Sequence, residues 1–277
     1  MKKFFNFKTI ASLLVALMLA ATPALAEQLV IKGSTTVLPV AQEIIEAYMN
    51  THPDVSISLS GGGSGNGIKA LIDGTTDIAN ASRFIKDKEV QLAMAKKKYP
   101  VPFRVALDCI VPVVHSSNSA TNLTLNQLKG IYSGKITDWS EVGGSGGRIV
   151  VVSRDSSSGT FEVWEDIVLD GGRVTPRALT VASNGAAVQT VTSTKGAIAY
   201  IGMGYLNDEL KQVKVNNVMG TETTTQNGQY PISRPLFMFT DGWPEGTTLS
   251  FINFVFSKPG QKLVRKVGSV PVFDPGK

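Results

Sequence analysis

Three segments of this chain share one pattern: an apolar, strand-like run ends in a loop of small polar residues, and helical spacing of apolar residues follows. The loops are 34–36, 60–67 and 153–158. Strands that alternate with helices through short loops predict an α/β fold with mainly parallel sheets. In such sheets ligands bind beyond the carboxyl ends of the strands, at helix N-termini. The pattern therefore places all three loops where a ligand site is expected.

The third loop carries donors that suit a tetrahedral oxyanion. Arg154 supplies a charge, and Ser158, Gly159 and Thr160 supply hydroxyl and backbone N–H groups at the predicted start of a helix. Such donors, together with the helix dipole, favour a bound anion. An ordinary loop with Ser158 as the helix N-cap is the alternative, because capping Ser and Thr are common. The guanidinium of Arg154, which can pair bidentately with an anion, favours a binding site.

The other loops leave a structural and a functional interpretation open. Ser34, Thr35 and Thr36 suit plain helix capping as well as ligand binding, and capping is favoured from these residues alone. The glycines of 60–67 let backbone N–H groups approach a ligand, but their composition also suits a flexible linker. This loop matches neither the dinucleotide-binding nor the P-loop spacing. Arg83, directly after a predicted strand, is either a donor to a ligand or a surface charge.

The N-terminus predicts export. Residues 1–26 combine three Lys and no acidic residue with a short apolar run and an Ala-x-Ala signal that ends at Ala26, which is typical of a cleaved signal peptide. A membrane anchor is the alternative, although the apolar run is short for a span. Removal of residues 1–26 lowers the net charge from +5 to +2, because three of the 27 basic residues and none of the 22 acidic ones are lost. Without a basic stripe, nucleic-acid binding is not expected.

Residue types that serve metal or redox chemistry are scarce. Cys109 is the one cysteine, so no internal disulfide is possible, and its apolar neighbours predict a buried thiol. Neither His52 nor His115 has partners at metal-ligand spacing. The G-x-S-x-G pattern of serine hydrolases is absent around Ser64 and Ser158. We therefore predict no catalytic residue, no metal and no cofactor.

The remaining periodicity supplies a coarse map of the chain. Apolar spacing predicts helices over 37–48, 87–98, 125–131, 186–194, 249–256 and 261–267. A continuous apolar run predicts a long buried strand over 103–114, and the polar segment 222–230 is predicted to be a loop. The tryptophans are expected to pack in the core or between lobes rather than to stack on sugars: Trp139, Trp164 and Trp243.

Seven segments, which follow one another along nearly the whole mature chain, resemble the PstS family, the phosphate-binding subunits of bacterial phosphate ABC importers. They are 33–39 (GSTTVLP), 61–69 (GGGSGNGIK), 77–83 (DIANASR), 132–139 (YSGKITDW), 154–161 (RDSSSGTF), 196–200 (GAIAY) and 230–235 (YPISRP). The resemblance implies a type II periplasmic-binding-protein fold, which is an α/β fold of two lobes with mixed, mainly parallel sheets and two hinge crossings. It assigns residues 27–108 and 233–277 to lobe I and residues 109–232 to lobe II.

The same resemblance implies a function and a ligand set. The protein would capture inorganic phosphate in the periplasm and present it to a membrane permease, as a monomer without enzymatic activity. The phosphate ligands would be Ser34, Thr35, Thr36, Ser64, Arg83, Arg154, Ser158, Gly159 and Thr160. Better-known long members have an Asp, which accepts the proton of monohydrogen phosphate, where this chain has Arg83. That departure leaves selectivity against sulfate or molybdate open. A secreted phosphatase, or an adhesion or regulatory module of the same shape, is the more distant alternative.

Overall fold

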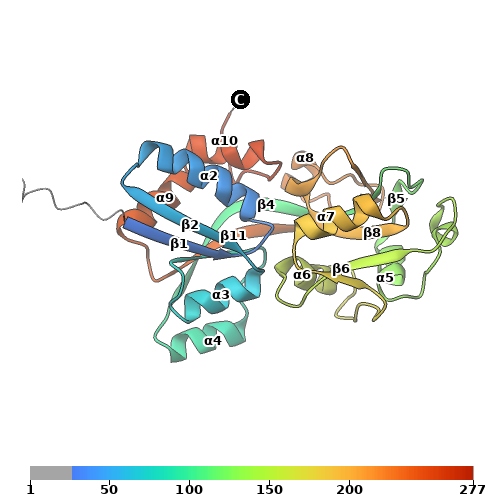
Figure 1. Ribbon diagram of the computed structural model, residues 1–277, viewed down its shortest axis with the longest axis horizontal. Coiled ribbons are helices and arrows are strands. Elements are labelled where there is room, and N and C mark those ends of the chain that lie inside the picture. The colour runs from blue at the N-terminus through green and yellow to red at the C-terminus, as the bar shows by residue number, and fades with distance from the viewer. Residues whose placement is uncertain (1–26, 277) are drawn as a thin grey trace, which may run out of the picture.

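Three hydrophobic clusters organise the computed structural model, which describes residues 27–276 (Figure 1). One cluster is built from residues of the segment 109–232, and we call this part lobe II. The other two lie on opposite faces of a second sheet region, in segments before and after lobe II, and we call this part lobe I. The predicted signal peptide lies outside the described residues. Among the described residues, no helix combines the length and the hydropathy that a membrane span needs.

Lobe I is a sheet covered by helices on both faces. Its strands run in the order β2-β1-β3-β11-β4, with β1, β2 and β3 parallel and β11 antiparallel to β3. These strands are β1 (Glu27–Gly33), β2 (Val55–Gly61), β3 (Ile78–Ala81), β11 (Ser233–Asp241) and β4 (Pro100–His115). One face packs against α2 (Leu38–Thr51), α9 (Gly246–Val255) and α10 (Lys258–Lys266). The other face packs against α3 (Ser64–Ile72), beyond which lies α4 (Asp87–Ala95) (Figure 1).

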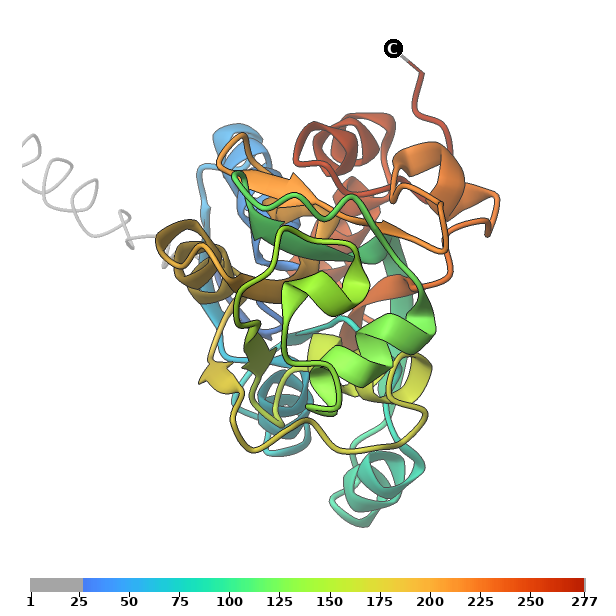
Figure 2. The same ribbon diagram turned by 90° about the vertical axis from the view of Figure 1, so that its right-hand side faces the viewer.

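Lobe II continues the same sheet beyond β4. Its strands are β8 (Ala197–Gly202), β6 (Val150–Arg154) and β7 (Leu179–Val181), in the order β4-β8-β6-β7. Its helices are α5 (Leu125–Tyr132), α6 (Gly159–Ile167), α7 (Asn184–Ser193) and α8 (Glu222–Gln226). Short elements complete it: β5 (Asn122–Leu123), β9 (Leu210–Gln212), β10 (Lys214–Val215) and the 3₁₀ helices η1 (Trp139–Val142) and η2 (Met203–Tyr205). Figure 2 views the molecule from the lobe II end, with α5 toward the viewer.

Strand β4 joins the two lobes. Its residues from Pro100 to Cys109 pair with β11, whereas from Ile110 onward it pairs with β8 and then β9. The chain returns to lobe I at the start of β11, so β4 and β11 lie side by side where the lobes meet. The change of pairing partner falls next to the predicted lobe boundary at 108 and 109.

The predicted fold class is confirmed, and several local predictions can be judged. Cys109, Trp139 and Trp164 are buried as expected. The prediction for Trp243 is wrong, because its side chain is 71% exposed and contacts the Phe103 ring from the surface. The loop predicted over 222–230 is wrong in its first half, where α8 forms behind a Thr221 N-cap whose hydroxyl accepts from the Thr224 N–H. A helix can begin at a capping residue in a polar segment even where the sequence has no apolar periodicity.

The aromatic cluster of lobe II gives a test of its core. Trp164 is fully buried, stacks on Tyr200 at 4.4 Å between ring centroids and meets the edge of Tyr132. We expect Trp164→Ala to lower the free energy of unfolding by about 3–5 kcal/mol, because it leaves a large cavity. The control Trp243→Ala should change it by about 0.5 kcal/mol or less, since that ring is mostly exposed. Urea denaturation followed by far-UV circular dichroism measures both free energies of unfolding. Equal losses in the two variants would contradict the placement of Trp164 in the core and of Trp243 at the surface.

Candidate functional site

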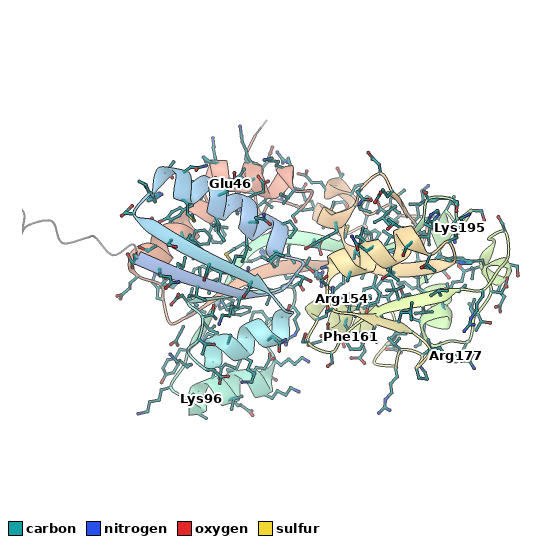
Figure 3. The ribbon with its side chains drawn as sticks, in the orientation of Figure 1. Glu46, Lys96, Arg154, Phe161, Arg177 and Lys195 are labelled. Carbon is teal, nitrogen blue, oxygen red and sulfur yellow. The ribbon has the colours of Figure 1, made fainter. Side chains whose placement is uncertain are left out.

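The carboxyl ends of parallel strands from both lobes face one another. In lobe I, the ends of β1, β2 and β3 lead into residues 34–36, the N-terminus of α3 and residues 82–83. In lobe II, the ends of β6 and β7 lead into the N-termini of α6 and α7. Figure 3 shows Arg154 and Phe161 on the side of lobe II that is turned toward lobe I. All three loops singled out from the sequence therefore lie in one region, as the rule for parallel sheets predicts.

Buried hydroxyl groups line the lobe I side of this region. Thr35 and Thr36 precede Val37, the N-cap of α2, and no side chain caps that helix, so plain capping does not explain them. The Ser34 hydroxyl accepts from the Thr36 N–H at 3.1 Å and thereby shapes the loop. Ser64 begins α3; its Oγ accepts from the Ser82 N–H at 2.9 Å and lies 3.3 Å from the Ser82 Oγ. The Gly-rich loop is therefore part of this ordered lining of lobe I and is not a flexible linker.

Arg154 brings a buried charge from lobe II. The residue is 4% exposed, and its Nε and Nη2 donate to the Val181 and Ala182 carbonyls at 3.2 and 3.0 Å. Nη2 also donates across to the Thr35 Oγ1 at 3.2 Å. Nη1 is buried without a hydrogen-bond partner, and none of the ion pairs among residues 27–276 includes Arg154. Burial lowers the pKa of this guanidinium, which reflects the cost of a charge without a counter-charge.

The N-terminus of α6 approaches lobe I closely. Ser158 is its N-cap, as predicted, and its Oγ accepts from the Phe161 N–H at 3.3 Å. The first N–H groups of a helix have no intrahelical acceptor, so Gly159 and Thr160 present donors beside Ser64. A Cβ at Gly159 would overlap with the Ser64 Oγ and lie 2.9 Å from the Ser82 Oγ, so only glycine permits this approach.

The two lobes touch through a network of hydroxyls. The Thr36 Oγ1 of lobe I and the Thr160 Oγ1 of lobe II are 2.9 Å apart. The Asn184 Nδ2 donates to the Oγ1 atoms of Thr35 and Thr36, each at 3.1 Å. The Arg234 Nη2 donates to the Thr36 and Thr160 Oγ1 atoms at 3.2 and 3.0 Å. The structure is therefore closed over the region in which the predicted ligands meet.

Arg234 reaches this network from the junction of the lobes. Both Arg234 and Asp108 are buried, and the guanidinium donates twice to the Asp108 Oδ2, at 2.9 and 3.1 Å. The Asp108 Oδ1 accepts from the Met203 N–H at 3.0 Å. Burial raises the pKa of Asp108 and lowers that of Arg234, and the ion pair opposes both shifts. Its charge is thus matched inside the protein, unlike that of Arg154.

Arg83 faces carboxylates instead of the hydroxyl network. Its Nη1 and Nη2 donate to the two oxygens of Glu89, each at 2.8 Å, and its Nε lies 2.7 Å from the Glu162 Oε2 on α6. Although burial opposes the charge, the hydrogen bonds and charges of Glu89 and Glu162 raise the pKa of Arg83. Lys86 also pairs with Glu162. Because Arg83 and Glu162 belong to different lobes, this cluster bridges the lobes beside the hydroxyl network.

Four residues of the region were not among the predicted ligands. Asn184, Arg234, Asp108 and Ser82 were given no role, although Ser82 and Arg234 lie within segments that resemble the PstS family. The rule that ligands gather beyond strand ends could have found Ser82 and Asn184, which follow β3 and β7. Arg234 and Asp108 lie inside strands, where this rule has no signal.

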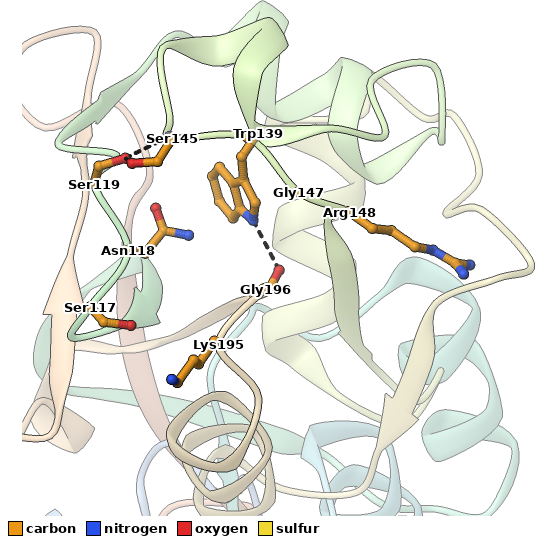
Figure 4. A pocket seen from close by; sticks show the side chains of 10 residues that line it. Ser117, Asn118, Ser119, Trp139, Ser145, Gly147, Arg148, Lys195 and Gly196 are labelled. Carbon is orange, nitrogen blue, oxygen red and sulfur yellow. Dashed lines mark hydrogen bonds between the residues drawn. The ribbon is translucent and has the colours of Figure 1, made fainter.

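A cavity of about 340 Å³ lies elsewhere, in lobe II away from lobe I (Figure 4). Its lining includes Trp139, Arg148 and Lys195 and none of the predicted ligands. The Trp139 Nε1 donates to the Gly196 carbonyl at 3.1 Å, so its one polar group is already used. The charged side chains of Arg148 and Lys195 are exposed. Donors do not converge here as they do between the lobes.

Comparisons with known proteins give the family context of this geometry. Residues 20–259 match the model of the PBP superfamily domain. A phosphate-binding protein PstS of Staphylococcus epidermidis is 35% identical over 244 residues, which cover 83% of this chain and 74% of that protein. A phosphate ABC transporter substrate-binding protein of Clostridium perfringens, solved with bound phosphate, is 35% identical with a TM-score of 0.83, over 89% of this chain and 100% of that chain. An ABC-type phosphate transport receptor of Vibrio cholerae is 32% identical with a TM-score of 0.72, over 87% of this chain and 99% of that chain.

The bridge between Arg83 and Glu162 gives a test of closure. We expect Glu162→Gln to destabilise the closed arrangement by about 1–3 kcal/mol, because Arg83 and Lys86 lose a charged partner across the lobes. Small-angle scattering should then show a larger radius of gyration than in the unchanged protein. Asp166→Asn removes the same charge from an exposed position on α6 and is the matched control. Equal radii for both variants would contradict a bridging role.

Proposed function

We propose that this chain captures inorganic phosphate between its lobes for an ABC importer. The chain belongs to the PstS family of phosphate-binding proteins. The observation that carries the proposal is the buried guanidinium of Arg154, whose Nη1 has no hydrogen-bond partner and which forms no ion pair with a carboxylate of the described residues. A buried charge without a partner costs several kcal/mol. An anion in the closed cleft removes that cost, and helix N-termini and hydroxyls already surround the place where it would sit.

The proposed ligand set divides between the lobes. Arg154 supplies the main counter-charge, and the N–H groups of Gly159 and Thr160 and the hydroxyl of Thr160 supply donors from lobe II. From lobe I, the hydroxyls of Thr35, Thr36 and Ser64 complete the shell. Of the other predicted ligands, Ser34 and Ser158 support loop and helix through hydrogen bonds to the Thr36 and Phe161 N–H groups. Arg83 is proposed to hold the lobes together through Glu162, not to contact the anion.

We further propose that the protein binds phosphate without catalysis. Hydrolysis needs a base that activates a nucleophile. His52 stacks on Tyr48 at the end of α2, and His115 bonds to Ser117 beyond β4, so the two imidazoles are engaged outside the network. Within residues 27–276, no group of three or more His, Cys, Asp or Glu side chains is arranged to hold a metal ion. Turnover of a chromogenic phosphate ester would contradict this part of the proposal.

Arg154 gives the sharpest test of the proposed function. Calorimetric titration should show that the unchanged protein binds inorganic phosphate, and that Arg154→Ala weakens binding by about 100-fold or more, since a desolvated charge pair is worth about 2–5 kcal/mol. Arg177→Ala, an exposed arginine of the same lobe (Figure 3), should bind normally. Sulfate and molybdate in parallel titrations test selectivity. Tight binding of those anions without phosphate binding would overturn the assignment.

The proposed location is the periplasm, with a membrane permease as the partner and the monomer as the working form. The sequence of residues 1–26 supports export. We expect that protein recovered from the periplasmic fraction of expressing cells begins at Glu27, and intact-mass spectrometry measures this directly. Retention of residues 1–26, with the protein in the membrane fraction, would instead support an anchor.

A further inference from the structure

We infer that Asn184 and Arg234 fix the hydroxyl hydrogens of Thr35, Thr36 and Thr160, so that Thr35 and Thr160 donate to the bound anion and cannot accept from it. A hydroxyl has one hydrogen to donate and two lone pairs with which to accept. Where donors fill both lone pairs, the hydrogen must point elsewhere. The inference rests on the proposed phosphate site and assigns a specificity role to two residues outside the predicted ligand set.

The Thr35 hydroxyl has both lone pairs filled. Its Oγ1 accepts from the Arg154 Nη2 at 3.2 Å and from the Asn184 Nδ2 at 3.1 Å. The orientation of the Asn184 amide is fixed, because its Oδ1 accepts from the Gly202 N–H at 3.2 Å and a backbone N–H can only donate. The Thr35 hydrogen is therefore directed away from both donors and is available to an anion.

The same count applies to the hydroxyls that meet across the lobes. The Thr36 Oγ1 accepts from the Asn184 Nδ2 and the Arg234 Nη2, so its hydrogen goes to the Thr160 Oγ1 at 2.9 Å. The Thr160 Oγ1 then accepts from Thr36 and from the shared Arg234 Nη2 hydrogen at 3.0 Å. The Thr160 hydrogen is left to the ligand. Thr35 and Thr160 thus present hydrogens from opposite lobes.

Arg234 cannot reverse the direction in which these hydroxyl hydrogens point, because it can only donate. A guanidinium has no acceptor atom, and Asp108 holds it through two hydrogen bonds. The chain of donors therefore begins at a charge that is fixed in place and ends at the ligand. On this side of the cleft, a ligand oxygen that carries a proton finds no acceptor.

This polarity sets which protonation state of phosphate can bind. The Ser64 and Ser82 hydroxyls differ from the threonines, because the Ser82 N–H and the bond between the two hydroxyls fill only two of their four lone pairs. The free acceptor positions lie side by side, since the two Oγ atoms are 3.3 Å apart, and we infer that they face one ligand oxygen. The single proton of monohydrogen phosphate can face these serines. Dihydrogen phosphate has a second protonated oxygen, which must face the donors. We therefore assign the dianion as the preferred ligand.

The ionisable groups around the network are arginines, buried tyrosines and carboxylates. Arg154 and Arg234 stay protonated. Asp108 is paired with Arg234, although burial raises the pKa of this carboxyl, and Asp155 lies next to Arg154 and interacts with its charge. Tyr200 and Tyr205 line the region from β8 and η2, and burial raises the pKa of each to about 12. The cluster of Arg83, Glu89 and Glu162 lies beside the network, and its charges compensate one another. Asn184→Ala keeps all of these groups, so a difference in pH response between this variant and the unchanged protein reports the hydroxyl network and not these groups.

The test compares phosphate affinity at about pH 8 and about pH 5. For the unchanged protein, affinity should fall about tenfold per pH unit below the second ionisation of phosphate, following the dianion fraction. Asn184→Ala frees a lone pair on Thr35 and on Thr36, so its binding should weaken about tenfold at pH 8 but lose much less on acidification. Asn184→Asp replaces the donor by an acceptor and should abolish binding at both pH values.

Ser183→Ala is the matched control, because Ser183 caps the same helix by accepting from the Ala186 N–H at 3.0 Å. It should keep the pH profile of the unchanged protein, and circular dichroism should show all variants folded. A uniform loss of affinity in Asn184→Ala at both pH values would reduce Asn184 to a structural role and overturn the inference. Failure of the unchanged protein to bind phosphate at either pH would instead overturn the proposed function.

Discussion

A buried positive charge without a counter-charge is the constraint on which the closed form depends. The Arg154 guanidinium is anchored by the Val181 and Ala182 carbonyls, which orient it but do not neutralise it. Closing the lobes removes the water that would otherwise solvate it, so an anion that enters the cleft offsets a cost of closure. In the proposed function, phosphate favours the closed form because both lobes contribute to the proposed ligand set.

The three buried arginines of this region differ in whether a carboxylate pairs with them, and this difference explains their separate roles. Arg154 forms no ion pair, and its Nη1 has no hydrogen-bond partner, which is why we propose it as the counter-charge of the anion. Arg234 is matched by Asp108 and orders hydroxyls. Arg83 is matched by Glu89 within its own lobe and by Glu162 across the cleft. A sequence shows three arginines near strand ends, but only the neighbouring carboxylates decide which of them remains free for an anion.

Much of the fold could be predicted from the sequence, because apolar periodicity and small-residue loops are local signals. The loops after β1, β2 and β6 and the Ser158 N-cap were found in this way. Arg83 shows the limit: its partner Glu162 is 79 residues away, and no local pattern records that contact. Asn184 follows a strand of three residues, too short for a periodic signal. Arg234 lies within β11, where side-chain direction depends on register with β4.

The register of β4 and β11 has a consequence for the order of events in binding. Arg234 and Asp108 are paired residues in that ladder, at the place where β4 exchanges one lobe for the other. When two bodies swing about a common pivot, atoms at the pivot move least and those at the ends of the levers move most. In a rotation of the lobes about this junction, Arg234 therefore moves less than Thr36 and Thr160. Thr36 and Thr160 thus form their contacts on a guanidinium that Asp108 already holds, so one part of the closed arrangement is in position before the lobes meet.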